Sequence, residues 1–94
     1  MIFPTYEVSF EKNTFDDSIV VTGEIKNDSS RDYNMAIFRI ILYMRNKRAG
    51  AGIVKVYDFK KSITKPFRAY IPPDSENVKA SLIDRYEISI EGGY

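Results

Sequence analysis

The chain of 94 residues contains neither cysteine nor histidine. Histidine is the side chain that most often serves as a general base and as a metal ligand, and the cysteine thiolate is a common nucleophile. Without cysteine there is also no disulfide framework. These absences exclude most enzyme chemistry, so we expect a protein that is not an enzyme and that carries no cofactor.

Long apolar runs are also missing. The longest, residues 35–38 and 40–44, are separated by Arg39, whereas a membrane-spanning helix needs about 18 to 20 consecutive apolar residues. We expect no membrane insertion by this domain. Residues 1–10 alternate between apolar and polar instead of forming a basic end followed by an apolar block, which argues against a secretory signal peptide. A cytoplasmic protein and one module of a longer chain both remain open.

What is present is the composition of one globular domain spanning residues 1–94. Hydrophobic residues make up 44% of the chain and charged residues 29%, with only five glycines and four prolines. Such a chain can build a single packed core and is neither disordered nor fibrous.

Alternation of apolar and polar residues, the period of a strand with one buried face, recurs along the chain. It predicts strands at residues 6–10, 19–26, 36–44, 53–60, 62–71 and 86–90. A helix competes for 36–44, but aromatic and β-branched content and flanking turn residues favour a strand. Residues 74–84 fit either a short helix or a further strand.

Turn residues separate these strands. They lie at 12–14, at 27–32 and at 46–52, where an Ala-Gly-Ala-Gly stretch predicts a flexible loop. Gly23, inside a strand, indicates a bulge or a close backbone approach, and Pro66 indicates an edge strand or a strand start. The predicted fold is all-β: an antiparallel β-sandwich of about seven short strands, or a small barrel. The aromatic side chains expected to point inward are Tyr6, Phe10, Phe38, Tyr57 or Phe59, Phe67 and Tyr86.

Several segments resemble the FxLYD domain family. Residues 21–29 follow its V-x-G-x-I/V-x-N-x-S strand and turn, and residues 40–44 occupy its F-x-L-Y-D strand, with Ile40 and Met44 in place of Phe and Asp. Residues 86–90 are similar to its closing Y-x-v-x-v strand. The resemblance implies an immunoglobulin-like β-sandwich of bacterial and archaeal envelope or secreted proteins, with no catalytic residues.

The predicted strand 36–44 carries the first candidate site. Its second face holds Ile37, Arg39, Ile41 and Tyr43. If this face lies outside the sandwich, it forms an apolar patch suited to another protein or to self-association. If a loop or residues 74–84 cover it, it is part of the core. Pairing through an exposed edge strand is a second route to a dimer.

The second candidate is basic. Residues 39–68 hold nine basic residues and one acidic residue, and a polyanion-binding patch would use Arg45, Lys47, Arg48, Lys60 and Lys61. Against this, the sequence pI near 7.9 is not that of a dedicated nucleic-acid binder.

Paired carboxylates occur at Asp16-Asp17, Asp28/Asp32 and Asp74/Glu76. None has the spacing of a calcium-binding loop, and turn formation explains all three pairs, so we expect no metal site.

Overall fold

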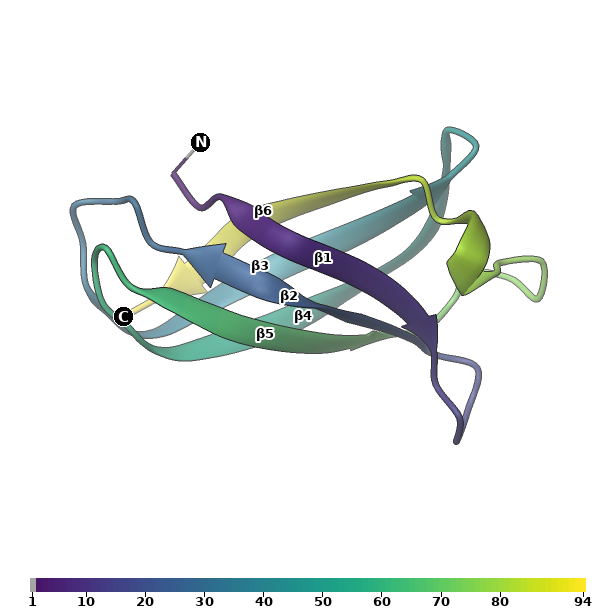
Figure 1. Ribbon diagram of the computed structural model, residues 1–94, viewed down its shortest axis with the longest axis horizontal. Helices are drawn as coiled ribbons and strands as arrows, with labels where there is room; N and C mark the ends of the chain where they lie inside the picture. The colour runs from purple at the N-terminus through teal and green to yellow at the C-terminus, as the bar shows by residue number, and fades with distance from the viewer. Residues whose placement is uncertain (1) are drawn as a thin grey trace.

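The computed structural model describes residues 2–94 and shows two three-stranded antiparallel sheets packed face to face (Figure 1). The first sheet has the order β1-β2-β5, formed by β1 (Thr5–Lys12), β2 (Ile19–Lys26) and β5 (Thr64–Ile71). The second has the order β4-β3-β6, formed by β4 (Lys47–Phe59), β3 (Tyr33–Met44) and β6 (Arg85–Gly93). The predicted all-β sandwich is confirmed. Residues 2–94 contain no helix long and apolar enough to cross a membrane.

Residues 2–94 form six strands, whereas the sequence predicted about seven. The sequence allowed either a short helix or a strand for residues 74–84. In the structure they form a loop with one 3-10 turn, Ala80–Leu82. Two prolines precede this loop and provide no backbone N–H for a ladder. Val78 and Ala80 pack against the core, while Leu82 is exposed.

The core lies between the sheets and follows the predicted alternation. Ala36, Phe38, Ile40 and Leu42 of β3 are all at most 1% exposed. They meet buried side chains from β2, β4 and β5, namely Ile19, Val21, Ile25, Val54, Val56, Phe59, Phe67, Ala69 and Ile71.

Two interruptions of the alternation change which aromatic rings are buried. The β1 to β2 register shifts between Tyr6 and Ser9, and Tyr6 pairs with Glu24 on the outer face, so the prediction that Tyr6 points inward is wrong. At Asp58 the backbone φ is 52°, and beyond it Phe59 enters the core while Tyr57 stays exposed. Phe10 and Tyr86 are half-buried.

The predicted loop at residues 46–52 is wrong. Arg45 and Asn46 alone make the turn, with φ of 53° and 64°, as in the two-residue hairpins that match strand twist. β4 therefore already includes Gly50, whose missing side chain admits the chain after β5: a Cβ there would lie 2.8 Å from the Pro72 carbonyl oxygen. The glycine serves close packing instead of flexibility.

Gly23 and Pro66 behave as predicted. A Cβ on Gly23 would lie 3.0 Å from Val8 Cγ2, opposite the irregularity in β1, so the glycine permits a close approach. Pro66 lies on β5, at the edge of the first sheet, where the lack of a backbone N–H costs no hydrogen bond between strands.

Asn27 is a fully buried polar residue that joins both sheets at one end of the sandwich. Its Nδ2 donates to the carbonyl oxygens of Arg31 at 2.8 Å and Phe59 at 2.9 Å. Its Oδ1 accepts from the Ser29 N–H at 3.0 Å and from the Ser29 hydroxyl. The side chain satisfies turn groups as its position after β2 predicts.

Candidate functional site

The second face of β3 lies outside the sandwich. β3 is the central strand of the second sheet, and its buried residues alternate with Ile37, Arg39, Ile41 and Tyr43. Arg39 is exposed and the other three are half-buried. The 3-10 turn instead contacts β1 of the first sheet. Because this face of β3 lies outside the sandwich, the four residues form an accessible patch.

Two residues of β4 extend this patch. Ile53 pairs with Arg39, and Tyr57 pairs with Met35, so both share its face, with the exposed Lys55 between them opposite Ile37. Ile53 is 47% exposed and Tyr57 is 60% exposed. The sequence did not identify them, because the pattern of residues 53–60 does not show which of the two faces of β4 is buried. We call the six residues Ile37, Arg39, Ile41, Tyr43, Ile53 and Tyr57 the outer patch.

A polar border from β6 flanks the outer patch. Arg39 forms an ion pair with Glu91, and the Tyr43 hydroxyl donates a hydrogen bond to Glu87. The Arg85 guanidinium lies over the Tyr43 ring, 3.8 Å from its centroid. These contacts hold Arg39 and Tyr43 in place beside the apolar side chains of the outer patch.

The hydrogen bond to Glu87 raises the pKa of Tyr43 above its ordinary value of 10.0, and the Glu87 charge adds to the effect. The contact therefore persists through neutral pH and is lost only when the phenol ionises in alkali. We expect Glu87→Gln to lower the pKa of Tyr43 toward 10.0, because the carboxylate charge that opposes phenolate formation is removed. A pH titration of the Tyr43 ring by NMR measures the shift; an unchanged midpoint would show that Glu87 does not control this hydroxyl.

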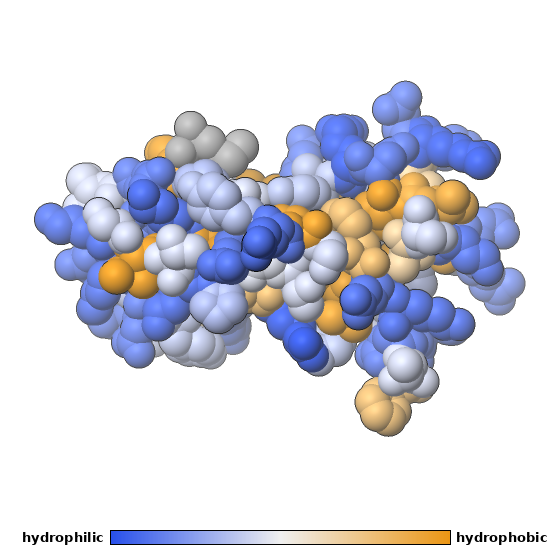
Figure 2. All heavy atoms as spheres, viewed as in Figure 1, coloured by the Kyte–Doolittle hydropathy of each residue, from blue (hydrophilic) through white to orange (hydrophobic). Residues whose placement is uncertain are grey.

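The opposite face of the molecule is different in character. The first sheet lies in front in Figure 1, and its surface in Figure 2 is mainly hydrophilic, with apolar atoms gathered near the 3-10 turn. Tyr70, which is 56% exposed, pairs with Val20 on this face. It provides a control position for the exposed Tyr57.

The five residues of the predicted polyanion patch do not form one surface. Arg45, Lys47 and Arg48 lie at the β3–β4 turn, whereas Lys60 and Lys61 follow the other end of β4 (Figure 1). Residues 49–59 of β4 lie between the two groups and separate Arg48 from Lys60 by about 40 Å, at roughly 3.3 Å per residue.

Acidic partners also accompany both basic groups. Arg48 forms an ion pair with Asp74 at 3.2 Å, and the Arg45 N–H donates to Asp84. At the other end, the Lys61 N–H donates to Asp32. Each basic group therefore has at least one carboxylate beside it, and Arg48 is paired with one in an ion pair.

Of the paired carboxylates, Asp16 stabilises a turn and Asp28 forms an ion pair. The Asp16 carboxylate accepts from the Ser18 hydroxyl at 2.6 Å and from the Ser18 N–H at 2.8 Å, and these hydrogen bonds lower the pKa of Asp16. Asp28 lies 3.2 Å from the Lys26 ammonium. Among residues 2–94 no group of three or more carboxylate side chains is placed to hold a metal ion.

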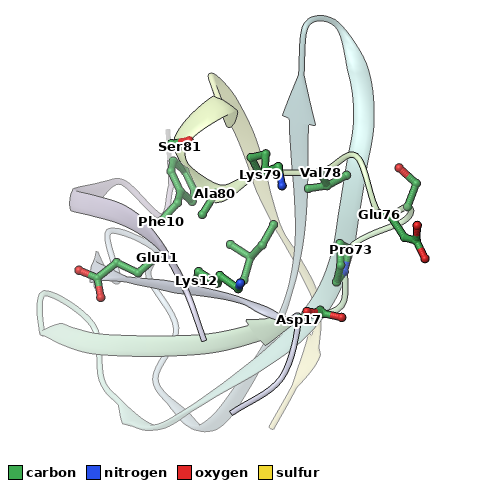
Figure 3. Close-up of a pocket in the computed structure, with 12 residues that line it drawn as sticks. Phe10, Glu11, Lys12, Asp17, Pro73, Glu76, Val78, Lys79, Ala80 and Ser81 are labelled. Carbon is green, nitrogen blue, oxygen red and sulfur yellow. The ribbon is translucent and has the colours of Figure 1, made fainter. Parts of the chain in front are cut away.

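Hollows open at the end of β1 and along β6. The larger, of about 830 Å³, lies between the end of β1 and residues 73–81, with Phe10, Val78 and Ala80 on its wall (Figure 3). Its charged residues have both signs, and Glu11 and Glu76 point away to opposite sides in Figure 3, so no polar groups converge on one point. The smaller, of about 690 Å³, lies along residues 86–89 of β6 and beside Thr5.

Comparison with family models, with curated proteins and with solved structures finds no match for this chain.

Proposed function

We propose that this chain is a non-catalytic β-sandwich module that binds another protein through the outer patch. The observation that carries the proposal is the apolar group on the exposed side of the second sheet: Ile37 and Ile41 on β3, and Ile53 and Tyr57 on β4. Apolar side chains gathered on one exposed face are typical of protein interfaces, as are tyrosine and arginine among them.

The geometry of the patch supports binding. β3 is hydrogen-bonded to a strand on each side, and Arg39 and Tyr43 are held by Glu91 and Glu87. A partner would therefore meet side chains that are already ordered, which lowers the entropy lost on association. The polar border from β6 would form the rim of the interface.

We further propose that the module is immunoglobulin-like and belongs to a cell-envelope or secreted protein, where it also acts as a spacer. The sheet orders β1-β2-β5 and β4-β3-β6 correspond to strands A-B-E and C′-C-F of an immunoglobulin sandwich. The resemblance to the FxLYD family supports the same fold and location. Fractionation of source cells with an antibody against the domain tests the location: detection only in the cytosol would contradict it.

Binding is tested with two matched variants, Tyr57→Glu on the outer patch and Tyr70→Glu on the first sheet. Both replace a tyrosine that is more than half exposed, so neither should disturb folding. A protein captured by the native chain from source-cell extract is identified, purified and titrated against all three chains. We expect Tyr57→Glu to weaken its binding about tenfold or more, as for an interface hot spot, and Tyr70→Glu to leave it unchanged.

Equal affinity for the native chain and Tyr57→Glu would contradict the proposal, as would loss of binding by Tyr70→Glu alone. Either outcome would move the interface away from the outer patch. If the native chain captures the same proteins as Tyr57→Glu, none of them binds through the outer patch. That result would contradict the binding proposal and leave only the spacer role.

A further inference from the structure

The edge of β6 that faces away from β3 is unpaired. Among residues 2–94, β6 forms a ladder only with β3, while β1 on the other side belongs to the first sheet. Tyr86 contacts β1 through its side chain, by a hydrogen bond of 2.5 Å between its hydroxyl group and Thr5 Oγ1 and by an edge-to-face contact with Phe10. An unpaired edge presents a row of backbone donors and acceptors to a further strand.

The space beside this edge is open. The smaller hollow is lined by residues 86–89 of β6, by Thr5 of β1 and by Ile41 of β3, so it lies along the first half of β6. Ile90, on the core-facing side of β6, is 38% exposed although its neighbour Phe38 on β3 is fully buried. The apolar row of β6 is thus incompletely covered on the side where a further strand would lie.

We propose that a second copy of this chain occupies this edge, with the two β6 strands paired antiparallel about a two-fold axis at Ile88. This inference concerns the edge of β6 and not the apolar face of the outer patch, although Arg85 and Glu91 border both, and it does not depend on the proposed function. In this register Ile88 meets itself, and opposite residues share a face of the sheet. The remaining pairs are Arg85 with Glu91 of the second copy, Tyr86 with Ile90 of the second copy, and Glu87 with Ser89 of the second copy, each formed twice.

The charges along β6 favour this register. Arg85 and Glu91, of opposite sign, become cross-strand neighbours, and both project on the outer face, where Arg85 lies over Tyr43 and Glu91 meets Arg39. The arginine of the second copy would add a second cation to Glu91. Opposite-charge pairs and aromatic to β-branched pairs are the cross-strand contacts that stabilise antiparallel sheets.

Neighbouring registers are less favourable. An axis at Glu87 places that carboxylate opposite itself, and an axis at Ser89 places Glu87 opposite Glu91 of the second copy. An axis between two residues pairs outward with inward positions, so that Ile88 would face a polar residue. The sequence of β6 therefore specifies one central register for pairing with itself.

The consequence is a continuous six-stranded sheet, β4-β3-β6 joined to its two-fold copy. Because opposite residues share a face, the outer patches of the two copies would lie on the same side of this sheet. A two-fold pairing closes on itself and leaves neither β6 edge open for further addition.

Charge reversal tests the proposal. Arg85→Glu places like charges opposite Glu91 in its own dimer, and Glu91→Lys places like charges opposite Arg85. Mixing the two variants restores two opposite-charge pairs in a heterodimer. We expect the native chain to dimerise in sedimentation-velocity titrations, each variant alone to dimerise about tenfold more weakly, and the equimolar mixture to recover the native affinity.

A native chain that is monomeric at millimolar concentration would overturn the proposal, as would variants that dimerise as the native chain does or a mixture that shows no recovery. Circular dichroism and thermal unfolding check that the variants fold. Amide hydrogen exchange of the native chain needs no variant: protection of residues 86–90 should rise with protein concentration, and protection independent of concentration would contradict the pairing. Binding of the native chain to other proteins leaves this result unaffected.

Discussion

Replacing Phe38 by alanine is expected to lower the free energy of unfolding by about 3–5 kcal/mol, the range found for large aromatic residues in protein cores. Phe38 is fully buried on the central strand of the second sheet. Its ring meets Phe3 and Phe59 edge to face, with centroid distances of 5.2 and 6.0 Å. Alanine would remove both aromatic contacts and leave a cavity between the sheets that neighbouring strands cannot fill.

Denaturant unfolding with linear extrapolation measures this loss. Phe15→Ala is the matched control, because the same atoms are removed from a side chain that is 95% exposed. We expect that control to change stability by no more than about 0.5 kcal/mol. If Phe38→Ala retains too little folded protein for a transition, Phe38→Leu provides a milder change; equal stabilities for the Phe38 and Phe15 variants would contradict the described core.

Asn27→Asp is expected to have a comparable effect that depends on pH. The amide Nδ2 now donates to two backbone carbonyl oxygens, from Arg31 and Phe59. A carboxylate at the same place would face these oxygens with no proton to donate, in a fully buried position. At pH 7 we expect a loss of about 3 kcal/mol, the low end of the range for a buried charge without its partner, because the two Ser29 donors to Oδ1 remain and offset part of the cost.

The pH dependence follows from the pKa of the new carboxyl. Burial and two nearby carbonyl oxygens raise its pKa in the folded state above the value of about 3.9 in the unfolded chain. Below that value the group is protonated in both states, so the difference in stability from the native chain is smallest. The difference grows as pH rises from the unfolded pKa through the folded pKa, where the unfolded chain has released the proton first.

Unfolding curves of the native chain and the variant at pH 3 and pH 7 measure this difference directly. Asn77→Asp makes the same change at an exposed position in the loop before the 3-10 turn, so its difference from the native chain should be small at both pH values. A loss for Asn27→Asp that is the same at pH 3 and pH 7 would show that the introduced carboxyl is not held in the pocket occupied by Asn27.

Much of the fold could be predicted because apolar residues recur at every second position on the buried side of the strands. The apolar parity of β3 and β2 identified core positions such as Phe38, Ile40 and Val21 correctly. The exceptions are local. The irregularity after Tyr6 and the positive φ at Asp58 each break the alternation, and neither residue type announces a bulge.

The candidate site was predictable only in part. Alternation identified Ile37, Ile41 and Tyr43 as a second face of β3, but only the packing of the sheets shows that this face is outside. Ile53 joins it through the register of β4, and Glu91 joins it through β6, 52 residues after Arg39 in the chain. Such partners depend on long-range strand pairing, which has no local signature.

Composition and the local period of apolar residues were enough to predict the fold class and most core positions, and they showed the lack of histidine and cysteine. Strand packing and register set which face of β3 is exposed, place the basic residues at opposite ends of β4 and, among residues 2–94, leave one edge of β6 without a partner strand. The physical reason is that burial, charge clustering and free edges are properties of neighbours in space. In a sandwich, most of those neighbours come from distant strands.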